Sequence, residues 1–546
     1  MFLFHRFPPL TLGLALVWVG CSPEPQSADS LPPGAKVLHI GNEAEPSSLD
    51  PQITTGLPEM RIHWALFEGL ITLDPDTLEP RGGVAERWTI SPDGRTWTFY
   101  LRPDLTWSDG TPLTAEAFRF SWRRLLSPAL GADYASQLYP VRGAEAYHRG
   151  ETDAFSTVGI DVPAPDRLVV TLEQPIPYFL TLLAHPATYP VPEHAITAHG
   201  AVTARANDWV RPGNHVGNGP FRLTDWQVNA RVSVEKNPAY RDADQVALEG
   251  IRFFPIEQNS TEERAFRAGQ LHLTSNVPLD RLDWYRENHP EWLQSDPDLG
   301  TYYFLINTRE PPFDDPRVRR ALALSLDREA IARYIRRRGE PPAWTFVPPG
   351  MPGYRAPAVR RRDVEAAQAL LAEAGYPGGE GFPPVELLFN TSEQHRAIAE
   401  AVQAMWGELL GIRIDLVNQE WKVYLDTRRN GAFQLARASW FGDYLDPGTF
   451  LELWTTEATN NFSGWSDPVY DRLVATGQDG TLPEQARMDA YREAEQRLIQ
   501  AAPIIPVFFY NRTFLRAPNV TGWPSNILHY TQYKRVDLQT APPESE

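Results

Sequence analysis

The sequence predicts a mixed α/β protein that is divided into two or three lobes. The chain has 546 residues, which is more than one ordinary hydrophobic core serves. Hydrophobic residues make up 42% of it, enough to fill several cores. Short alternating runs, typical of strands, are interspersed with helical patterns along the chain. No internal repeat or low-complexity block interrupts this mixture after the N-terminal segment.

The first 35 residues are predicted to lie outside the folded part. Residues 1–20 carry one early basic residue, Arg6, and then a short apolar run, as a signal peptide does. The run is too short to span a bilayer. Residues 17–21 resemble a bacterial lipobox, so we expect Cys21 to be lipidated and residues 21–35 to form a polar, Pro-rich tether. The alternative is plain secretion with a chance cysteine.

In the first half, the clearest element is a β-hairpin. Residues 87–90 and 96–101 are predicted strands, and Asp93-Gly94 lies in the turn between them. Trp97, Phe99 and Leu101 share one face of the second strand. Further on, Thr114 is predicted to cap a helix that carries Phe118, Phe120 and Trp122.

In the second half, strands and helices alternate, which favours α/β packing. The patterns predict a list of elements: a helix from Asp315-Pro316 to about Arg337, helices over 363–374 and 391–410, and strands over 412–417 and 504–510. Gly375 is expected to end the helix that precedes it.

Charge and motifs exclude several function classes. The net charge of −18 disfavours nucleic acid as a partner. There is no Gly-Lys dipeptide, hence no Walker A loop, and no His-Glu-x-x-His or Gly-x-Ser-x-Gly motif. The single cysteine leaves no internal disulfide and no cysteine cluster for zinc. We therefore expect no cofactor, no metal and no enzymatic activity. A hydrolase with an unrecognised site is the alternative from another class.

Several stretches together carry a family resemblance. They are residues 85–102, 107–116 and 120–122, joined by 48–51, 67–70, 219–221, 307–327, 418–422 and 437–446. These segments resemble the sequences of the family 5 extracellular solute-binding proteins of ABC importers. Within that family they are most similar to the oligopeptide-binding proteins. The matches are distributed over nearly the whole mature chain.

The resemblance implies a three-lobed, periplasmic-binding-protein-like fold with two main lobes that close on a ligand cleft. Lobe I is expected to comprise residues 36–68, 194–300 and 511–546. Lobe II is expected as a smaller insertion, residues 69–193, and lobe III as residues 301–510. Closure about a hinge is the motion that such folds use.

The implied ligand is a short peptide, whose constant features are an α-ammonium, a carboxylate and backbone amides. A buried ammonium requires a carboxylate, and a terminal carboxylate suits arginine. By the resemblance, Asp443 receives the peptide amine, and Arg428, Arg437 and His395 meet the carboxylate for different peptide lengths. Backbone contacts and pocket walls are assigned to Thr55, Gly56, Leu57, Tyr134, Asn276, Trp421, Ser439, Trp440, Phe441 and Tyr510.

Each of these residues also has a structural interpretation. Asp443 could form a salt bridge with Arg437, and Arg428 could be a solvated neighbour of Arg429. Trp421 and Trp440 could be core residues.

The expected function is that of an extracytoplasmic receptor, periplasmic or at the cell surface. It would be a monomer, held to the membrane only by its lipid anchor. It would deliver peptides to the permease and ATPase subunits of an importer. The alternatives are a family member for a dipeptide, a cell-wall peptide, nickel, haem or a sugar, or a receptor that senses peptides without importing them.

Overall fold

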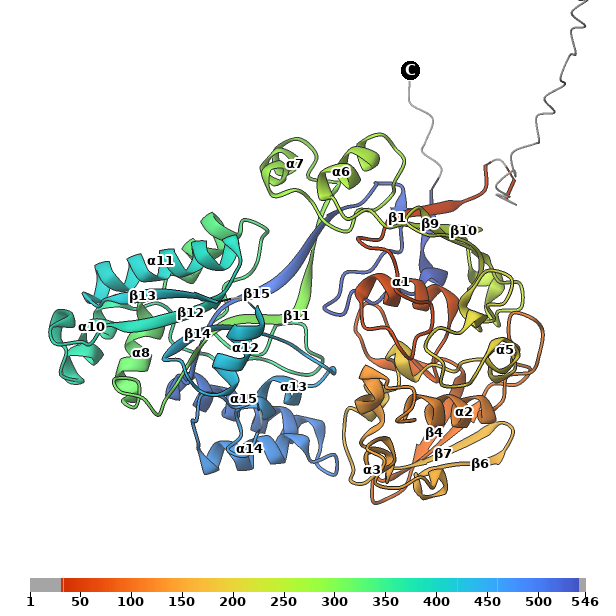
Figure 1. The fold of residues 1–546 in the computed structure, drawn as a ribbon, viewed down its shortest axis with the longest axis horizontal. Coiled ribbons are helices and arrows are strands. Elements are labelled where there is room, and N and C mark those ends of the chain that lie inside the picture. Colours follow the sequence, from red (N-terminus) through yellow and green to blue (C-terminus); the bar gives the residue numbers. More distant parts are fainter. Residues whose placement is uncertain (1–30, 33, 420, 459, 540–546) are drawn as a thin grey trace, which may run out of the picture. The chain divides into compact units, whose positions relative to one another are not determined.

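The computed structural model describes residues 31–539, apart from residues 33, 420 and 459. A first sheet of four strands combines distant parts of the chain in the order β1-β10-β9-β8. Its strands are β1 (Val37–Gly41), β8 (Phe221–Gln227), β9 (Arg231–Lys236) and β10 (Gly250–Phe254). β1 runs parallel to β10, and the other pairs are antiparallel. Helix α1 (Leu57–Leu66) follows β1 in the chain (Figure 1).

A second four-stranded sheet lies within the range predicted for lobe II and has the order β4-β5-β7-β6. Its strands are β4 (Ala85–Ile90), β5 (Thr96–Leu101), β6 (Ile160–Ala164) and β7 (Arg167–Thr171). The predicted hairpin is confirmed, and Gly94 has a φ of 70° in its turn. Trp97, Phe99 and Leu101 are buried, as their shared face predicts.

Helix α2 (Ala115–Leu125) begins where it was predicted, with Thr114 at the N-cap. The Thr114 side chain makes no capping hydrogen bond, so that detail of the prediction is wrong. Phe118 and Trp122 are fully buried. The helix is therefore held by its apolar face more than by its cap.

The third sheet has five strands in the order β13-β12-β14-β11-β15. They are β11 (Leu293–Ile306), β12 (Val385–Asn390), β13 (Ile414–Gln419), β14 (Leu435–Phe441) and β15 (Ile504–Leu515). β12 runs parallel to β13 and β14, whereas β11 is antiparallel to β14 and β15. β15 is the predicted 504–510 strand, extended by five residues.

Helices cover both faces of this sheet (Figure 1). They are α8 (Pro316–Ser325), α10 (Val364–Glu373), α11 (Glu393–Leu410), α14 (Pro468–Gln478) and α15 (Glu484–Ala501). Successive side chains of a strand point to opposite faces. Tyr302, Phe304 and Ile306 of β11 accordingly pack with α8, α10 and α11, while Tyr303 and Leu305 pack in the cluster that includes α14 and α15.

The helix predicted from Asp315 to Arg337 is not continuous. α8 ends at Ser325, Leu326 is extended with a ψ of 124°, and Asp327 then caps the short helix α9 (Arg328–Ala330). A π-helical turn over Ile331–Arg336 completes the segment. The Arg328 guanidinium explains part of this geometry, because its Nε donates to the Pro506 carbonyl at 2.7 Å.

The other predicted helices are confirmed with small shifts at their ends. Asp363 caps α10, and Gly375 follows it with a φ of 100°. Ser392 caps α11, so this helix starts two residues later than predicted. The remaining helices and strands are β2 (Ile71–Leu73), β3 (Pro80–Gly82), β16 (Val520–Thr521), β17 (Asp537–Leu538), α3 (Ala144–His148), α4 (Phe179–Leu182), α5 (Glu193–His199), α6 (Asn259–Arg267), α7 (Leu282–Asn288), α12 (Trp421–Arg429) and α13 (Gly448–Leu451).

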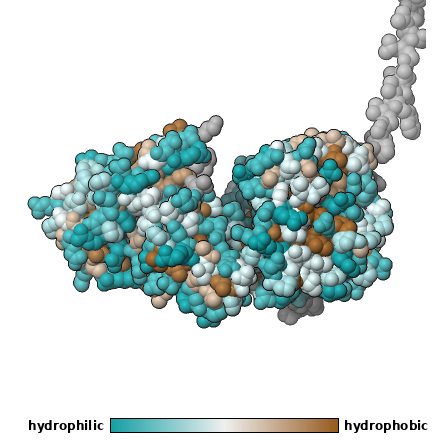
Figure 2. All heavy atoms as spheres, turned by 90° about the horizontal axis from the view of Figure 1, so that it is seen from below, coloured by the Kyte–Doolittle hydropathy of each residue, from teal (hydrophilic) through white to brown (hydrophobic). Residues whose placement is uncertain are grey.

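The described residues from Lys36 onward form one compact unit. The first two sheets fall within the ranges predicted for lobes I and II. The third falls mainly within lobe III, with β11 and β15 extending past its predicted limits. The lobe boundaries therefore stay a prediction. Hydrophilic residues dominate the face in Figure 2. In the described part of the chain, no helix combines the length and apolar character needed to cross a membrane.

Candidate functional site

The candidate site is built on strand β14 and the segment that follows it. β14 pairs along its length with β11, and Arg437 stands opposite Phe304. On its other edge β14 pairs with β12 only at Leu435 and Ala436. Within the described strands, residues 437–441 therefore have one edge without a strand partner. Such an edge offers backbone N–H and C=O groups to an added strand. At Arg437 the backbone carbonyl already accepts the Tyr424 hydroxyl, so the edge is free of recorded backbone partners from Ala438 onward.

Arg437 lies at the start of this open edge and is 7% exposed. Its guanidinium donates to Asn390 Oδ1 at 3.2 Å, to Ser439 Oγ at 3.2 Å and to the Tyr510 hydroxyl at 3.3 Å. It also lies 5.1 Å from the centre of the Tyr302 ring. Its Nε is buried without a hydrogen-bond partner. Among the described residues no carboxylate lies within ion-pair distance of Arg437, although a buried charge ordinarily requires one.

His395 lies in the first turn of α11, close to the same group. Its ring centre is 5.7 Å from that of Tyr302, and its Nδ1 is buried without a partner. Burial lowers the pKa of His395 to about 3, with smaller contributions from Arg437 and Arg336. The imidazole is therefore neutral at pH 7, and it offers a hydrogen bond but no charge.

Arg428 lies on α12 and is half-buried. Its Nη1 is 3.3 Å from the Tyr424 hydroxyl, and its guanidinium lies 5.4 Å from the centre of the Phe462 ring. Its neighbour Arg429 is exposed and pairs with Asp426 at 3.0 Å. In the part of the chain that the structure describes, Arg428 has no carboxylate within 4.0 Å. The two adjacent arginines thus have different environments.

Asp443 follows β14 after Gly442. Its backbone N–H donates to Thr449 Oγ1 at 2.9 Å, which fixes the turn. Its carboxylate remains accessible to water, yet desolvation by the surrounding protein raises its pKa above the usual value. No basic side chain lies within 4.0 Å of it among the described residues, so the structure records no Asp443–Arg437 salt bridge.

The aromatic residues around β14 have distinct surroundings. Trp440 is half-buried, and its Nε1 donates to the Thr449 carbonyl at 2.8 Å. Phe441 is 48% exposed, and its ring lies 4.8 Å from that of Tyr510. Gly300 stands opposite Phe441, and a Cβ there would come within 2.5 Å of the Phe441 ring. Glycine at that position is what lets the Phe441 ring lie across β11.

A cavity of about 260 Å³ adjoins Asp443. Tyr134 and Phe441, both predicted as site residues, line it, and the charge of Asp443 contributes to raising the pKa of Tyr134 after burial. His185 also lines it and lies 4.3 Å from Tyr134, measured between ring centres. Sequence reasoning missed His185, because this contact joins residues that are far apart in the chain.

The other predicted residues are not brought into this group by any recorded contact. Asn276 is half-buried, and its backbone N–H is 3.4 Å from Glu262 Oε2. Thr55 is exposed and lies outside the helices and strands, and Gly56 is the N-cap of α1. A Cβ at Gly56 would approach Glu59 Oε2 to 2.2 Å.

Two predicted positions lie wholly or partly outside the described residues. Cys21 lies outside them. Trp421 begins α12, and its side chain is not among the described ones. Within the described residues, no group of three or more His, Cys, Asp or Glu side chains could hold a metal ion.

Known proteins resemble this chain over most of its length. The sequence model for the middle region of the bacterial extracellular solute-binding proteins, family 5, matches residues 79–462. The periplasmic oligopeptide-binding protein OppA of Escherichia coli K12 is 37% identical over 497 residues, which cover 89% of this chain and 90% of that protein.

Solved structures of solute-binding proteins also resemble this chain. The unliganded open form of the MppA murein tripeptide binding protein has a TM-score of 0.85 and 34% identity, over 92% of this chain and 98% of that one. Haemophilus influenzae OppA in complex with RPPGFSPFR has a TM-score of 0.69 and 33% identity, over 93% and 99%. The predicted periplasmic-binding-protein-like fold is confirmed, and the chain belongs to the bacterial extracellular solute-binding proteins, family 5.

Proposed function

We propose that this protein is a receptor for short peptides and delivers them to an ABC importer. One observation carries the proposal. The segment from Arg437 to Asp443 holds a buried cation and a partly desolvated anion, and neither has an oppositely charged partner among the described residues. A peptide with free termini supplies both missing charges. A neutral sugar supplies neither.

The open edge of β14 supports the same ligand. A peptide in extended conformation can add to residues 438–441 as a strand, so that its backbone amides are bound whatever its side chains. In this proposal Asp443 receives the α-ammonium, and Arg437, Arg428 or His395 receives the carboxylate. The backbone N–H and C=O groups of residues 439–441 form hydrogen bonds with the peptide.

The remaining predicted contacts belong to the same proposal. Thr55, Gly56, Leu57, Tyr134, Asn276, Trp421 and Tyr510 would bound the ligand after lobe closure. Two relatives support a peptide ligand by their descriptions: OppA of Escherichia coli is an oligopeptide-binding protein, and OppA of Haemophilus influenzae holds RPPGFSPFR.

Asp443 provides the test. Asp443 is exposed in this structure, so its pair with the ligand amine would be desolvated when the lobes close over the peptide. Removing one partner of such a desolvated pair costs about 2–5 kcal/mol. Asp443→Ala should therefore weaken peptide binding by roughly thirty-fold to several thousand-fold, at about 1.4 kcal/mol per factor of ten. N-acetylation removes the same charge from the ligand, so the two changes should not add. Calorimetry on wild type and variant, each with free and acetylated peptide, measures this coupling.

Asp426→Ala serves as the matched control, because Asp426 is an exposed aspartate that pairs with Arg429. This control should leave affinity unchanged. If wild type binds free and acetylated peptides equally, Asp443 is not the amine partner. If no peptide binds, the same titration with nickel, haem and sugars decides among the other ligands of the family, and native mass spectrometry identifies what the purified protein retains.

We also propose that the receptor is monomeric, is not an enzyme, and is held outside the cytoplasm by lipidated Cys21. The short apolar run before Cys21 supports the anchor. Cys21→Ala should move the protein from the membrane fraction to the soluble fraction. Unchanged fractionation would contradict the lipid anchor without affecting the peptide site.

A further inference from the structure

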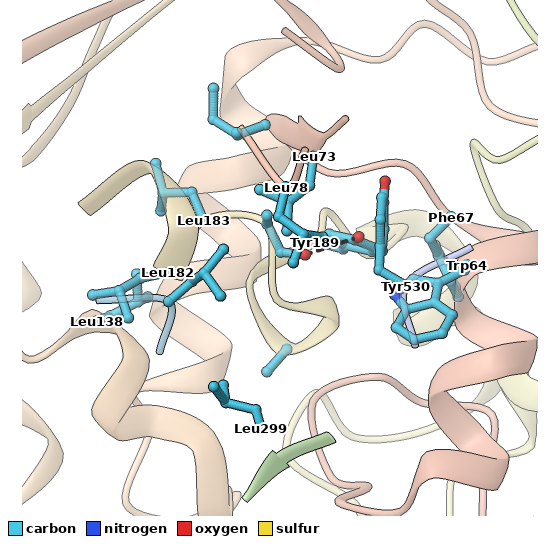
Figure 3. Close-up of a cluster of buried hydrophobic side chains, with 14 of the residues drawn as sticks. Trp64, Phe67, Leu73, Leu78, Leu138, Leu182, Leu183, Tyr189, Leu299 and Tyr530 are labelled. Atoms are coloured by element: carbon cyan, nitrogen blue, oxygen red, sulfur yellow. Dashed lines mark hydrogen bonds between the residues drawn. The ribbon is translucent and has the colours of Figure 1, made fainter. Parts of the chain in front are cut away.

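A second cavity, of about 420 Å³, has walls from helices α8, α9 and α15, strand β15 and the segment between α9 and α10 (Figure 1). None of its lining residues lines the cavity beside Asp443 or is labelled in the hydrophobic cluster of Figure 3. Its volume falls within the range of small-molecule sites, about 300–1,000 Å³. The cavity is therefore a separate candidate for a ligand site.

Arg328 is the buried cation of this cavity, at 4% exposed. Its Nε donates to the Pro506 carbonyl at 2.7 Å, and its Nη1 donates to the Ala323 carbonyl at 2.9 Å. Its Nη2 makes no hydrogen bond with the described residues and is not closed off from solvent. Burial lowers the pKa of Arg328 to about 9, so the guanidinium still carries its charge at pH 7. Nη2 can therefore donate to an anion that enters the cavity.

The lining of this cavity is positively charged, although the net charge of the whole chain is −18. Arg320, Arg328 and Arg360 line it, and among the described lining residues none is acidic. Arg360 pairs with Asp363 at 2.5 Å. Arg320 and Arg328 have no carboxylate within ion-pair distance in the described part of the chain. A cation that is buried without a counter-ion is costly, so an anionic ligand is favoured here.

The rest of the lining is mostly apolar. Leu324 and Ile504 are buried, and Val359 is half-buried. The ring of Trp344 lies beside Arg328, with its centre 4.7 Å from the guanidinium. A small inorganic anion would leave these walls uncovered, whereas an anion with an apolar body would also bury their surface.

We propose that this cavity is a second ligand site, which binds a small organic carboxylate with an apolar body. The carboxylate accepts a hydrogen bond from Arg328 Nη2, and exposed Arg320 supplies a second positive charge. The apolar body contacts Leu324, Val359 and Ile504. The inference does not rest on the proposed peptide function, because the two sites share no residue.

Octanoate, octanamide and octylammonium test the role of the charge, because they have the same body and differ in the head group. By calorimetry, octanoate should bind wild type at least about tenfold more tightly than octanamide, since a charged acceptor forms the stronger hydrogen bond with a guanidinium. Octylammonium should not bind measurably. Acetate has the same head group without the body, and it should bind at least about tenfold more weakly than octanoate.

Val359→Asp connects octanoate binding to the cavity. The new carboxylate would repel the ligand and pair with the arginines, so octanoate binding should be lost. Val228→Asp is the matched control, because Val228 is 60% exposed and lies between β8 and β9, outside the cavity lining. This control should bind octanoate as wild type does.

The arginines are tested by replacing each with methionine. Arg320→Met should weaken octanoate binding by about two- to fivefold, the value of an exposed ion pair. Arg317→Met, on the same helix, is its control, because Arg317 is exposed and already pairs with Asp315 at 2.6 Å. Arg328→Met should weaken binding at least about tenfold. Melting curves verify that Arg328→Met folds, and Val359→Asp decides the question if it does not.

Three results would overturn the inference. They are equal affinity for octanoate and octanamide, unchanged octanoate binding by Val359→Asp, and no binding of octanoate to wild type. Arg437→Met should keep the wild-type affinity for octanoate; a loss there would place the probe in the peptide site instead. Each of these results leaves the proposed peptide function standing, because that function is tested separately at Asp443.

Discussion

At the scale of single residues, Arg437 is a buried guanidinium whose hydrogen-bond partners are all neutral. Asn390, Ser439 and Tyr510 accept its hydrogen bonds, and the Tyr302 ring lies beside it. Neutral acceptors compensate only part of the cost of removing such a charge from water. A ligand carboxylate would offset the rest of the desolvation cost of the Arg437 guanidinium. The part of this cost that the neutral acceptors leave unbalanced therefore favours ligand binding.

Arg437→Met is therefore expected to weaken binding of peptides with a free C-terminus by about 2–5 kcal/mol. The largest loss marks the peptide length whose carboxylate reaches Arg437, so peptides of two to six residues are compared by calorimetry. Stability without ligand should not fall by a comparable amount, because the variant loses a buried charge that has no counter-ion among the described residues.

Arg429→Met is the matched control, since Arg429 is exposed and pairs with Asp426. A loss of affinity that is equal for free and C-amidated peptides would exclude Arg437 as the carboxylate partner. A large fall in the unfolding free energy of Arg437→Met would instead indicate a structural role.

At the scale of elements, the interruption between α8 and α9 depends on a new N-cap. Asp327 accepts the backbone N–H of Ala330 at 2.8 Å, and its carboxylate lies 3.7 Å from Arg362. Asp327→Ala should lower the unfolding free energy by about 0.5–2 kcal/mol, the usual value of an N-cap. Urea unfolding measures it. Arg362→Ala removes only the exposed ion pair and should cost less than about 1 kcal/mol. Equal effects of the two substitutions would contradict the capping role.

At the scale of the whole molecule, two long strands connect the ranges predicted for lobes I and III. Residues 293–297 of β11 pair with 511–515 of β15, and residues 301–305 pair with 504–509, with an irregularity between Pro297 and Thr301. We expect this irregular region to act as the hinge of lobe closure.

A bound peptide should then make the protein more compact and more stable. At a thousandfold excess over its dissociation constant, the ligand should add about 4 kcal/mol to the unfolding free energy. Thermal unfolding and small-angle scattering with peptides of two to six residues measure both effects. Stabilisation without any change in radius would contradict closure, whereas absence of both effects for every peptide would contradict the ligand class.

Much of the fold could be predicted because its signals are local. The hairpin of β4 and β5 follows from alternation on either side of Asp93-Gly94, and α10 follows from its cap at Asp363 and its end near Gly375. The break at Leu326 was missed although Asp327 is a local N-cap signal, because the helical pattern of residues 316–337 continues across it. There the favourable helical propensity of residues 316–337 is overridden by tertiary contacts, including the bond from Arg328 to the Pro506 carbonyl.

The candidate site also has features that the sequence predicts and features that depend on the tertiary structure. Its charged residues could be proposed from the sequence, since Arg437, Ser439 and Asp443 lie within one short segment whose pattern resembles a family. Whether Arg437 and Asp443 pair with each other depends on the path of the backbone after β14, and the structure records no such pair.

The sequence by itself determined the alternation and capping of most elements, the family pattern, and the identities of the charged residues near β14. Only the tertiary structure decided three features of the described residues: β14 has an edge without a strand partner, Arg437 is buried without a counter-ion, and Trp64 and His185 line a cavity beside Asp443. The physical reason is the range of the interactions. Hydrogen bonds within a helix or hairpin join near neighbours, whereas burial and cavities depend on packing between segments that are hundreds of residues apart.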